Sequence, residues 1–99
     1  MAKYDVCPLR DGSGLILDVQ AELLDHLNTR VVVPLIAKGL APTPAQRLNP
    51  VFTIDDQLYV MVTQYLSAVS SSEIGKPIAN LDSDFSVITI ALDMVFQGY

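Results

Sequence analysis

The chain has 99 residues, of which 51% are hydrophobic and 17% charged, so it holds enough apolar side chains for one folded domain and too few charges for a disordered segment. Its net charge of −5 and its six scattered Lys and Arg residues weigh against direct binding to nucleic acid and suit a basic protein segment as partner. The single cysteine, Cys7, excludes an internal disulfide and a cysteine metal cluster.

Hydrophobic alternation and turn residues predict mainly short β-strands over residues 1–80. We expect strands at residues 3–7, 15–20, 30–37, 51–54 and 58–63, with strand continuing after a bend through 64–72. The pair Asp55-Asp56 between two of these runs is typical of a hairpin turn. Residues 38–50 hold three prolines and a glycine, which predicts a surface loop.

Individual residues in these strands carry further expectations. In the first strand Tyr4 and Val6 are expected on one face. Asp18 follows Leu17 in the second strand, and simple alternation places it on the solvent face. Pro34 has no N–H to donate to a neighbouring strand, which predicts an edge strand or a bulge at that point.

Residues 85–99 are almost wholly apolar and predict an α-helix over about 84–96. The polar side chains Ser86, Thr89, Asp93 and Gln97 are three, four and four residues apart, which is a helical period. The β-branched residues of this segment would also allow a strand, and the polar spacing favours the helix. We expect residues 82–84, Asp-Ser-Asp, to provide its N-cap.

This helix has an unusually large apolar surface. At about 100° per residue the four polar side chains fall within an arc of roughly 80°, so most of the circumference is apolar. A small domain covers one face of such a helix, and symmetric self-association is the simplest source of a second cover. The sequence therefore predicts a homodimer, with the ends of the two chains beside the interface.

No arrangement of side chains predicts catalysis, a cofactor or a metal site. His26 is the only histidine and has no evident nucleophile or metal partner, so we interpret it as an exposed loop residue. Asp55 and Asp56 fit a turn better than an acid–base pair. Residues 12–14, Gly-Ser-Gly, are too few to cradle a phosphate, and Cys7 is most simply a buried strand residue.

The sequence also favours a cytoplasmic protein without a membrane partner. Its apolar runs are shorter than the ~20 residues of a membrane span. The first residues lack the basic and then apolar layout of a secretion signal. We see no internal repeat and no second domain, so residues 1–99 are expected to form one domain.

Several short strings, taken in order, resemble the CcdB family, the toxins of bacterial toxin–antitoxin pairs. The matching strings are Asp18-Val19-Gln20 with Leu23-Leu24-Asp25, residues 30–35 (RVVVPL), Pro50-Val51 with Ile54, Met61-Val62-Thr63, Ile74-Gly75, Ala79-Asn80-Leu81, and residues 91–99 (ALDMVFQGY). They cover essentially the whole chain in register, with small length changes in the first hairpin and the proline-rich loop. The order and spacing of the strings carry the resemblance.

The resemblance implies a mainly β fold, an SH3-like small barrel of the CcdB/Kid type, with a C-terminal α-helix and a two-fold dimer. It implies a toxin that is not an enzyme: such a toxin binds the A subunit of DNA gyrase and stabilises the DNA-cleaved complex. A CcdA-like antitoxin, with a disordered C-terminal segment that folds on the toxin, would neutralise it.

The resemblance also implies site residues. In the family the last three residues, Trp-Gly-Ile, carry much of the gyrase contact, and Gln97, Gly98 and Tyr99 occupy these positions here. Gln97 is the main departure, because its amide has no aromatic face to stack on a partner's guanidinium group. Asp93, one turn earlier, and Ala21 and Leu23, after the second strand, are further gyrase-binding candidates.

For the antitoxin, the first hairpin loop and the proline-rich loop are the expected contacts, with Arg10, Asp11, Gly12 and Arg47 as candidates. Two other functions stay open. One is an endoribonuclease toxin of the same barrel, although one histidine and scattered arginines make a poor set for phosphate chemistry. The other is a non-toxic homologue that keeps antitoxin binding and has lost toxicity through Gln97.

Overall fold

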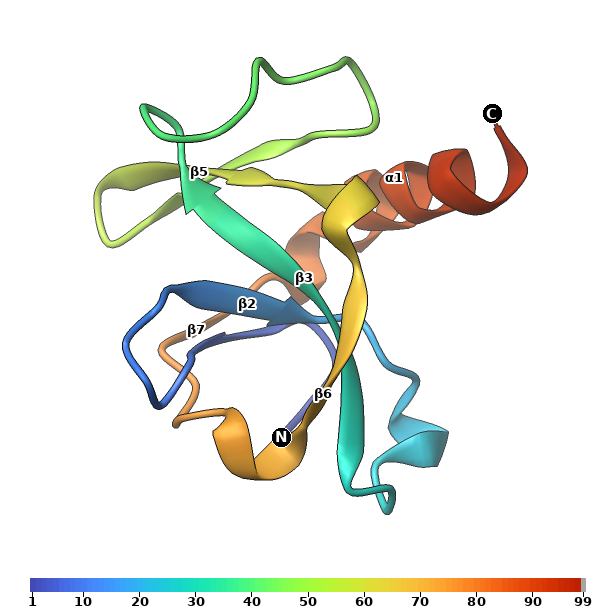
Figure 1. The fold of residues 1–99 in the computed structure, drawn as a ribbon. Coiled ribbons are helices and arrows are strands. Elements are labelled where there is room, and N and C mark those ends of the chain that lie inside the picture. The colour runs from blue at the N-terminus through green and yellow to red at the C-terminus, as the bar shows by residue number, and fades with distance from the viewer. Residues whose placement is uncertain (99) are drawn as a thin grey trace.

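The computed structural model describes residues 1–98 and shows a curled β-sheet with one α-helix packed on it (Figure 1). The strands are β1 (Asp5–Pro8), β2 (Leu15–Asp18), β3 (Thr29–Ala37), β4 (Val51–Ile54), β5 (Gln57–Met61), β6 (Ser67–Ser70) and β7 (Ala79–Asn80). Short 3₁₀ helices lie between them: η1 (Glu22–Leu24), η2 (Thr63–Tyr65), η3 (Ser71–Glu73) and η4 (Asp82–Asp84). The α-helix α1 (Phe85–Gln97) follows η4.

The strands form one antiparallel sheet in the order β4-β5-β3-β2-β1-β7, and β6 also pairs with β3. The long strand β3 makes the barrel close. Its first part, from Thr29 to Val32, pairs with β6, and its last part, from Leu35 to Ala37, pairs with β5. One strand thus belongs to both halves of a nearly closed barrel, and the predicted mainly β fold with a C-terminal helix is confirmed.

Successive residues of the inner strands enter two different apolar clusters. Val6, Leu17 and Val33 belong to the main core, which Ile88 and Ala91 of α1 cover. Their neighbours Cys7, Ile16 and Val32 point the other way, into a smaller cluster with Ile74. This is the period of two of a strand that is buried on both faces. Burial of each large aliphatic side chain contributes roughly 1.5–3 kcal/mol.

The predicted helix is confirmed, and Asp84 of the predicted segment occupies its N-cap position. Asp84 makes no side-chain capping hydrogen bond there, and residues 82–84 form the 3₁₀ helix η4 directly before α1. At the other end Gly98 adopts a left-handed conformation, with φ of 82°, and its N–H donates to the Met94 carbonyl at 3.0 Å. Glycine suits this position because it has no Cβ to oppose a positive φ.

The predicted hairpin at Asp55-Asp56 is confirmed: both residues have positive φ, 51° and 65°, as a tight turn between antiparallel strands requires. The first strand begins later than predicted, because Tyr4 has a φ of 71° and lies in a turn before β1. Tyr4 nevertheless packs against the core that contains Val6, as expected.

Of the two positions predicted for Pro34, an edge strand or a bulge, the edge strand is wrong, since β3 is central. Pro34 pairs with Ile16 of β2 on one side. On its other side the partner changes from β6 to β5, and the Pro34 carbonyl accepts a hydrogen bond from the Val62 N–H at 3.0 Å. The nitrogen and the carbonyl of a strand residue face the same side of the strand. The nitrogen of Pro34, which has no hydrogen to donate, therefore faces the place where β3 changes its partner from β6 to β5, and no backbone hydrogen bond of either ladder needs it.

Candidate protein-binding face

The exposed side of α1 is only partly polar. Ser86, Thr89, Asp93 and Gln97 are all exposed, as the helical period predicts. At about 100° per residue, large exposed apolar side chains flank this polar arc on both sides. Phe85 and Phe96 border one side, and Val87 and Ile90 border the other.

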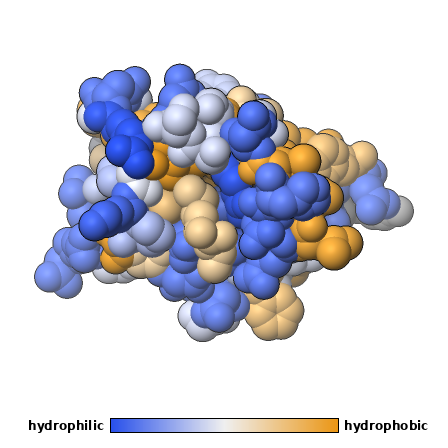
Figure 2. Space-filling view, turned by 90° about the horizontal axis from the view of Figure 1, so that it is seen from below, coloured by the Kyte–Doolittle hydropathy of each residue, from blue (hydrophilic) through white to orange (hydrophobic). Residues whose placement is uncertain are grey.

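A hollow of about 360 Å³ lies between η1 and the C-terminal half of α1. Its lining is mostly apolar and includes Ala21 and Leu24 from the η1 region, Leu66 after η2, and Leu92 and Phe96 of α1. Phe96 is 67% exposed, so it lies at the rim of the hollow and not at its base. Figure 2 views the molecule from below and shows hydrophobic residues at its right-hand side, the side toward which α1 runs in Figure 1.

We call the surface made of η1, this hollow and the C-terminal half of α1 the η1–α1 face. The structure brings together here the two parts of the chain that the sequence proposed for gyrase binding. Ala21 lines the hollow, Leu23 is 86% exposed on η1, and Asp93 lies on the exposed side of α1. Gln97 and Gly98 end the helix, and Tyr99 lies outside the described residues.

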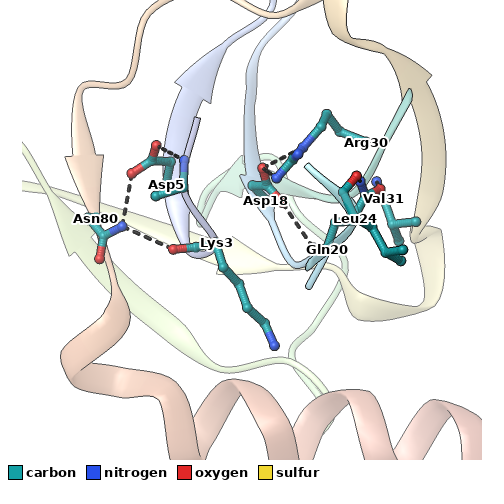
Figure 3. Close-up of polar contacts among 9 residues, drawn as sticks. Lys3, Asp5, Asp18, Gln20, Leu24, Arg30, Val31 and Asn80 are labelled. Atoms are coloured by element: carbon teal, nitrogen blue, oxygen red, sulfur yellow. Dashed lines mark hydrogen bonds and ion pairs between the residues drawn. The ribbon is translucent and has the colours of Figure 1, made fainter. Parts of the chain in front are cut away.

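A buried ion pair lies behind η1. The Arg30 guanidinium donates from Nε and Nη2 to Asp18 Oδ2 at 2.9 and 2.6 Å, and neither side chain is more than 3% exposed (Figure 3). The predicted solvent-facing position of Asp18 is therefore wrong. The reason is that the second apolar cluster, with Val69 and Ile74, covers this face of β2 and β3.

Burial is the largest influence on the Asp18 carboxyl and raises its pKa above the ordinary value. The hydrogen bond from the Gln20 N–H and the nearby Arg30 act in the opposite direction. The buried thiol of Cys7 responds to the same surroundings: desolvation, followed by the charges of Asp5 and Asp18, raises its pKa to about 11. Cys7 is thus an inert core residue, as the sequence predicts.

Gln20 connects the ion pair to η1. Its own N–H donates to Asp18 Oδ1 at 2.9 Å, its side-chain Nε2 donates to the Leu24 carbonyl at 2.9 Å, and its Oε1 accepts from the Val31 N–H at 3.0 Å (Figure 3). The strand and helix patterns of the sequence do not point to Gln20 as a site residue. The family resemblance could have indicated it, because Gln20 belongs to the matching string Asp18-Val19-Gln20.

The residues proposed for the antitoxin lie elsewhere. Arg10 and Asp11 line a hollow of about 270 Å³ with residues of β6 and η3, and Arg10 is held there because its Nε donates to the Ile74 carbonyl at 3.1 Å. A hydrogen bond from Ser13 to Asp11 lowers the pKa of that exposed carboxyl.

Gly12 lines a second hollow, of about 380 Å³, that includes Leu40 of the proline-rich loop and Tyr59. The first hairpin loop and the proline-rich loop thus line one hollow. Leu40, 84% exposed, is the residue of the proline-rich loop that lines it, whereas Arg47 lines neither hollow.

Among residues 1–98 no group of three or more His, Cys, Asp and Glu side chains could hold a metal ion. His26 is exposed. No helix within the same residues has the length and apolar character needed to cross a membrane.

Comparison with known proteins gives one family and one fold. The family model described as "CcdB protein" matches residues 3–98. Among solved structures, the Mycobacterium tuberculosis toxin MazF-mt6 is 15% identical, with a TM-score of 0.76 over 93% of this chain and 95% of that one. An endoribonuclease in complex with its cognate antitoxin, from mycobacterial species, is 17% identical, with a TM-score of 0.77 over 97% and 94%. At such identities the structural likeness shows a shared fold alone.

Proposed function

The chain belongs to the CcdB family of toxin–antitoxin toxins, and from this premise we propose that it binds the A subunit of DNA gyrase and traps the DNA-cleaved complex. Such a toxin needs no catalytic group of its own. It needs only a higher affinity for the cleaved conformation of the enzyme than for the others, and the population then shifts toward that state.

The η1–α1 face is the observation that supports this proposal best. Its two walls come from the two chain segments that the family resemblance assigns to gyrase, and its hollow is apolar with an exposed aromatic rim at Phe96. Exposed apolar surface beside a hollow is typical of a protein-binding site. Phe96 offers an aromatic contact next to Gln97, where the family has Trp.

We further propose that the protein is a cytoplasmic homodimer built from one domain per chain. The apolar side of α1 at Val87 and Ile90 is exposed at 43% and 44%, and a second copy would cover such a surface. We also propose that a CcdA-like antitoxin binds across the first hairpin loop. The cognate antitoxin bound to a mycobacterial endoribonuclease with a similar fold is consistent with such a partner.

The test is a gyrase cleavage assay with purified protein, gyrase, ATP and supercoiled plasmid. We expect linear DNA after denaturation of gyrase, and at least a tenfold weaker effect for Phe96→Ser. Leu58→Ser, at an exposed apolar residue of β5 away from the η1–α1 face, is the control and should behave as the unchanged protein. No linear DNA from the folded, unchanged protein would refute the proposal.

Two alternatives are decided by parallel assays. The endoribonuclease function is favoured by the fold of the mycobacterial relatives, and rapid RNA cleavage by the purified protein would support it. Against it stands Arg30, one of only six basic residues, which is buried and held by Asp18. A non-toxic homologue would be soluble and dimeric and would not arrest growth, and Gln97→Trp should then restore toxicity.

A further inference from the structure

We infer that Gln20 is a positioning residue that fixes η1 against the barrel and thereby sets the shape of the gyrase-binding hollow. The inference rests on the proposed function for the identity of the partner. The positioning itself rests on hydrogen bonds and burial, and both can be measured without gyrase.

The first step is that η1 has little packing of its own. Residues 21–29 are all exposed, and η1 buries none of its residues. Its N-terminus also lacks a side-chain capping hydrogen bond. Backbone bonds within the segment, such as Leu24 N–H to the Ala21 carbonyl at 2.9 Å, shape the turn but do not attach it to the sheet.

The second step is that Gln20 supplies an attachment. Its side chain is 5% exposed and bridges two elements: the amide donates to the Leu24 carbonyl at the end of η1 and accepts from the Val31 N–H of β3. A glutamine amide can do both because it carries a donor and an acceptor on one carbon. Figure 3 shows Gln20, Leu24 and Val31 close together beside the Asp18–Arg30 pair.

The third step is that Gln20 is itself held in place. Its backbone N–H donates to Asp18 Oδ1, while Asp18 Oδ2 accepts from Arg30. The chain of bonds therefore starts at a buried ion pair and ends at the backbone of η1. Gln20 itself lines the hollow, together with its chain neighbour Ala21 and its two hydrogen-bond partners Leu24 and Val31. A loosened η1 would change the wall that faces Leu92 and Phe96.

The test replaces Gln20 by Met, which keeps the volume and removes both side-chain hydrogen bonds. Asn80→Leu is the matched control, because the Asn80 amide also bridges two segments: its Nδ2 donates to the Lys3 carbonyl at 3.1 Å and to Asp5 Oδ1 at 2.9 Å (Figure 3). Hydrogen exchange of amides 21–28, gyrase affinity and antitoxin affinity are measured for both variants and the unchanged protein.

We expect Gln20→Met to raise at least tenfold the exchange rates of the hydrogen-bonded amides of this segment, those of Leu24, Asp25 and Leu27. It should also weaken gyrase binding about tenfold or more and leave antitoxin affinity unchanged. Asn80→Leu should change none of these three. Unchanged exchange in 21–28, or equal losses for both variants, would overturn the inference. If Gln20→Met does not fold, Gln20→Glu keeps the acceptor for Val31 and is judged by the same criteria.

The two proposals can fail separately. If the unchanged protein does not bind gyrase, the proposed function fails, and positioning by Gln20 is decided by exchange alone. Selective loss of protection in 21–28 would then support it, and its absence would overturn it.

Discussion

Asp18 and Arg30 form an ion pair with a shortest distance of 2.6 Å in a part of the barrel that solvent does not reach. The pair joins β2 to β3 diagonally, because Asp18 lies opposite Val32 in the ladder and Arg30 is two residues from Val32. Removal of one partner would leave the other charge buried and unpaired, which typically costs about 3–5 kcal/mol.

We therefore expect Arg30→Met to lower the free energy of unfolding by about 3–5 kcal/mol at pH 7, measured by urea denaturation. The double variant Asp18→Leu with Arg30→Met should recover much of this loss, because no buried charge remains. A double variant as unstable as the single one would show that packing rather than charge explains the effect.

The stability that Arg30→Met loses should depend on pH. Burial already raises the Asp18 pKa in the folded protein, and removal of Arg30 takes away an interaction that lowers it. A folded-state pKa above the unfolded value favours folding at low pH and disfavours it as pH rises through that pKa. Arg30→Met should thus lose less stability at pH 5 than at pH 8, relative to the unchanged protein. An equal loss at both pH values would contradict this.

The ion pair also marks the limit of what the sequence predicts. The period of two correctly placed most strands, and the polar spacing in residues 85–97 correctly placed α1. Alternation failed at Asp18, because it assumes that one face of the strand is open to solvent. Val69 and Ile74, more than fifty residues away in the chain, cover that face, and no local pattern shows this.

The sequence predicted residues of the candidate site, but it did not predict that η1 and the end of α1 lie side by side. Ala21 and Leu23 came from the family resemblance, and Asp93 and Gln97 from the resemblance and the helical period. That η1 and the end of α1 share one hollow depends on how α1 crosses the barrel, a tertiary relationship. Gln20 was missed because the strand predicted at 15–20 has it as its last residue, and glutamine is ordinarily exposed.

The exposed apolar side of α1 gives a prediction about self-association. Ile90→Glu should convert the proposed dimer into a monomer, because Ile90 lies on an exposed apolar border of the helix. Thr89→Glu is the matched control on the polar arc of the same helix, and it should stay dimeric. Sedimentation velocity at micromolar concentration measures the change, and circular dichroism checks that α1 is intact. A monomeric unchanged protein would refute the dimer.

Gly98 should be sensitive to substitution through its backbone. An added Cβ would meet no atom within 4 Å, so a loss in Gly98→Ala would reflect the φ of 82° and not a clash. We expect a loss of about 1 kcal/mol, with Gly98→Asn less affected. Gly39→Ala, which is equally uncrowded and lacks a positive φ, is the matched control and should change stability little. Thermal unfolding compares the three variants, and equal effects at the two glycines would contradict the strain argument.

Cys7 should make the protein sensitive to alkaline pH. Its thiol has no exposed surface, and burial together with Asp5 and Asp18 raises its pKa from 9.0 to about 11. The unfolded chain releases this proton at lower pH than the folded one, so the thiol favours folding fully below pH 9 and loses that effect as pH rises toward 11. We expect the melting temperature to fall over this interval, and to fall less in Cys7→Val, which cannot ionise. The Cys7→Val variant serves as the reference for every other effect of pH on the melting temperature. The native thiol should also resist a thiol reagent at pH 8 and react upon addition of denaturant. Parallel alkaline melting curves for the two proteins, or rapid labelling of the native thiol, would show that Cys7 is accessible to water.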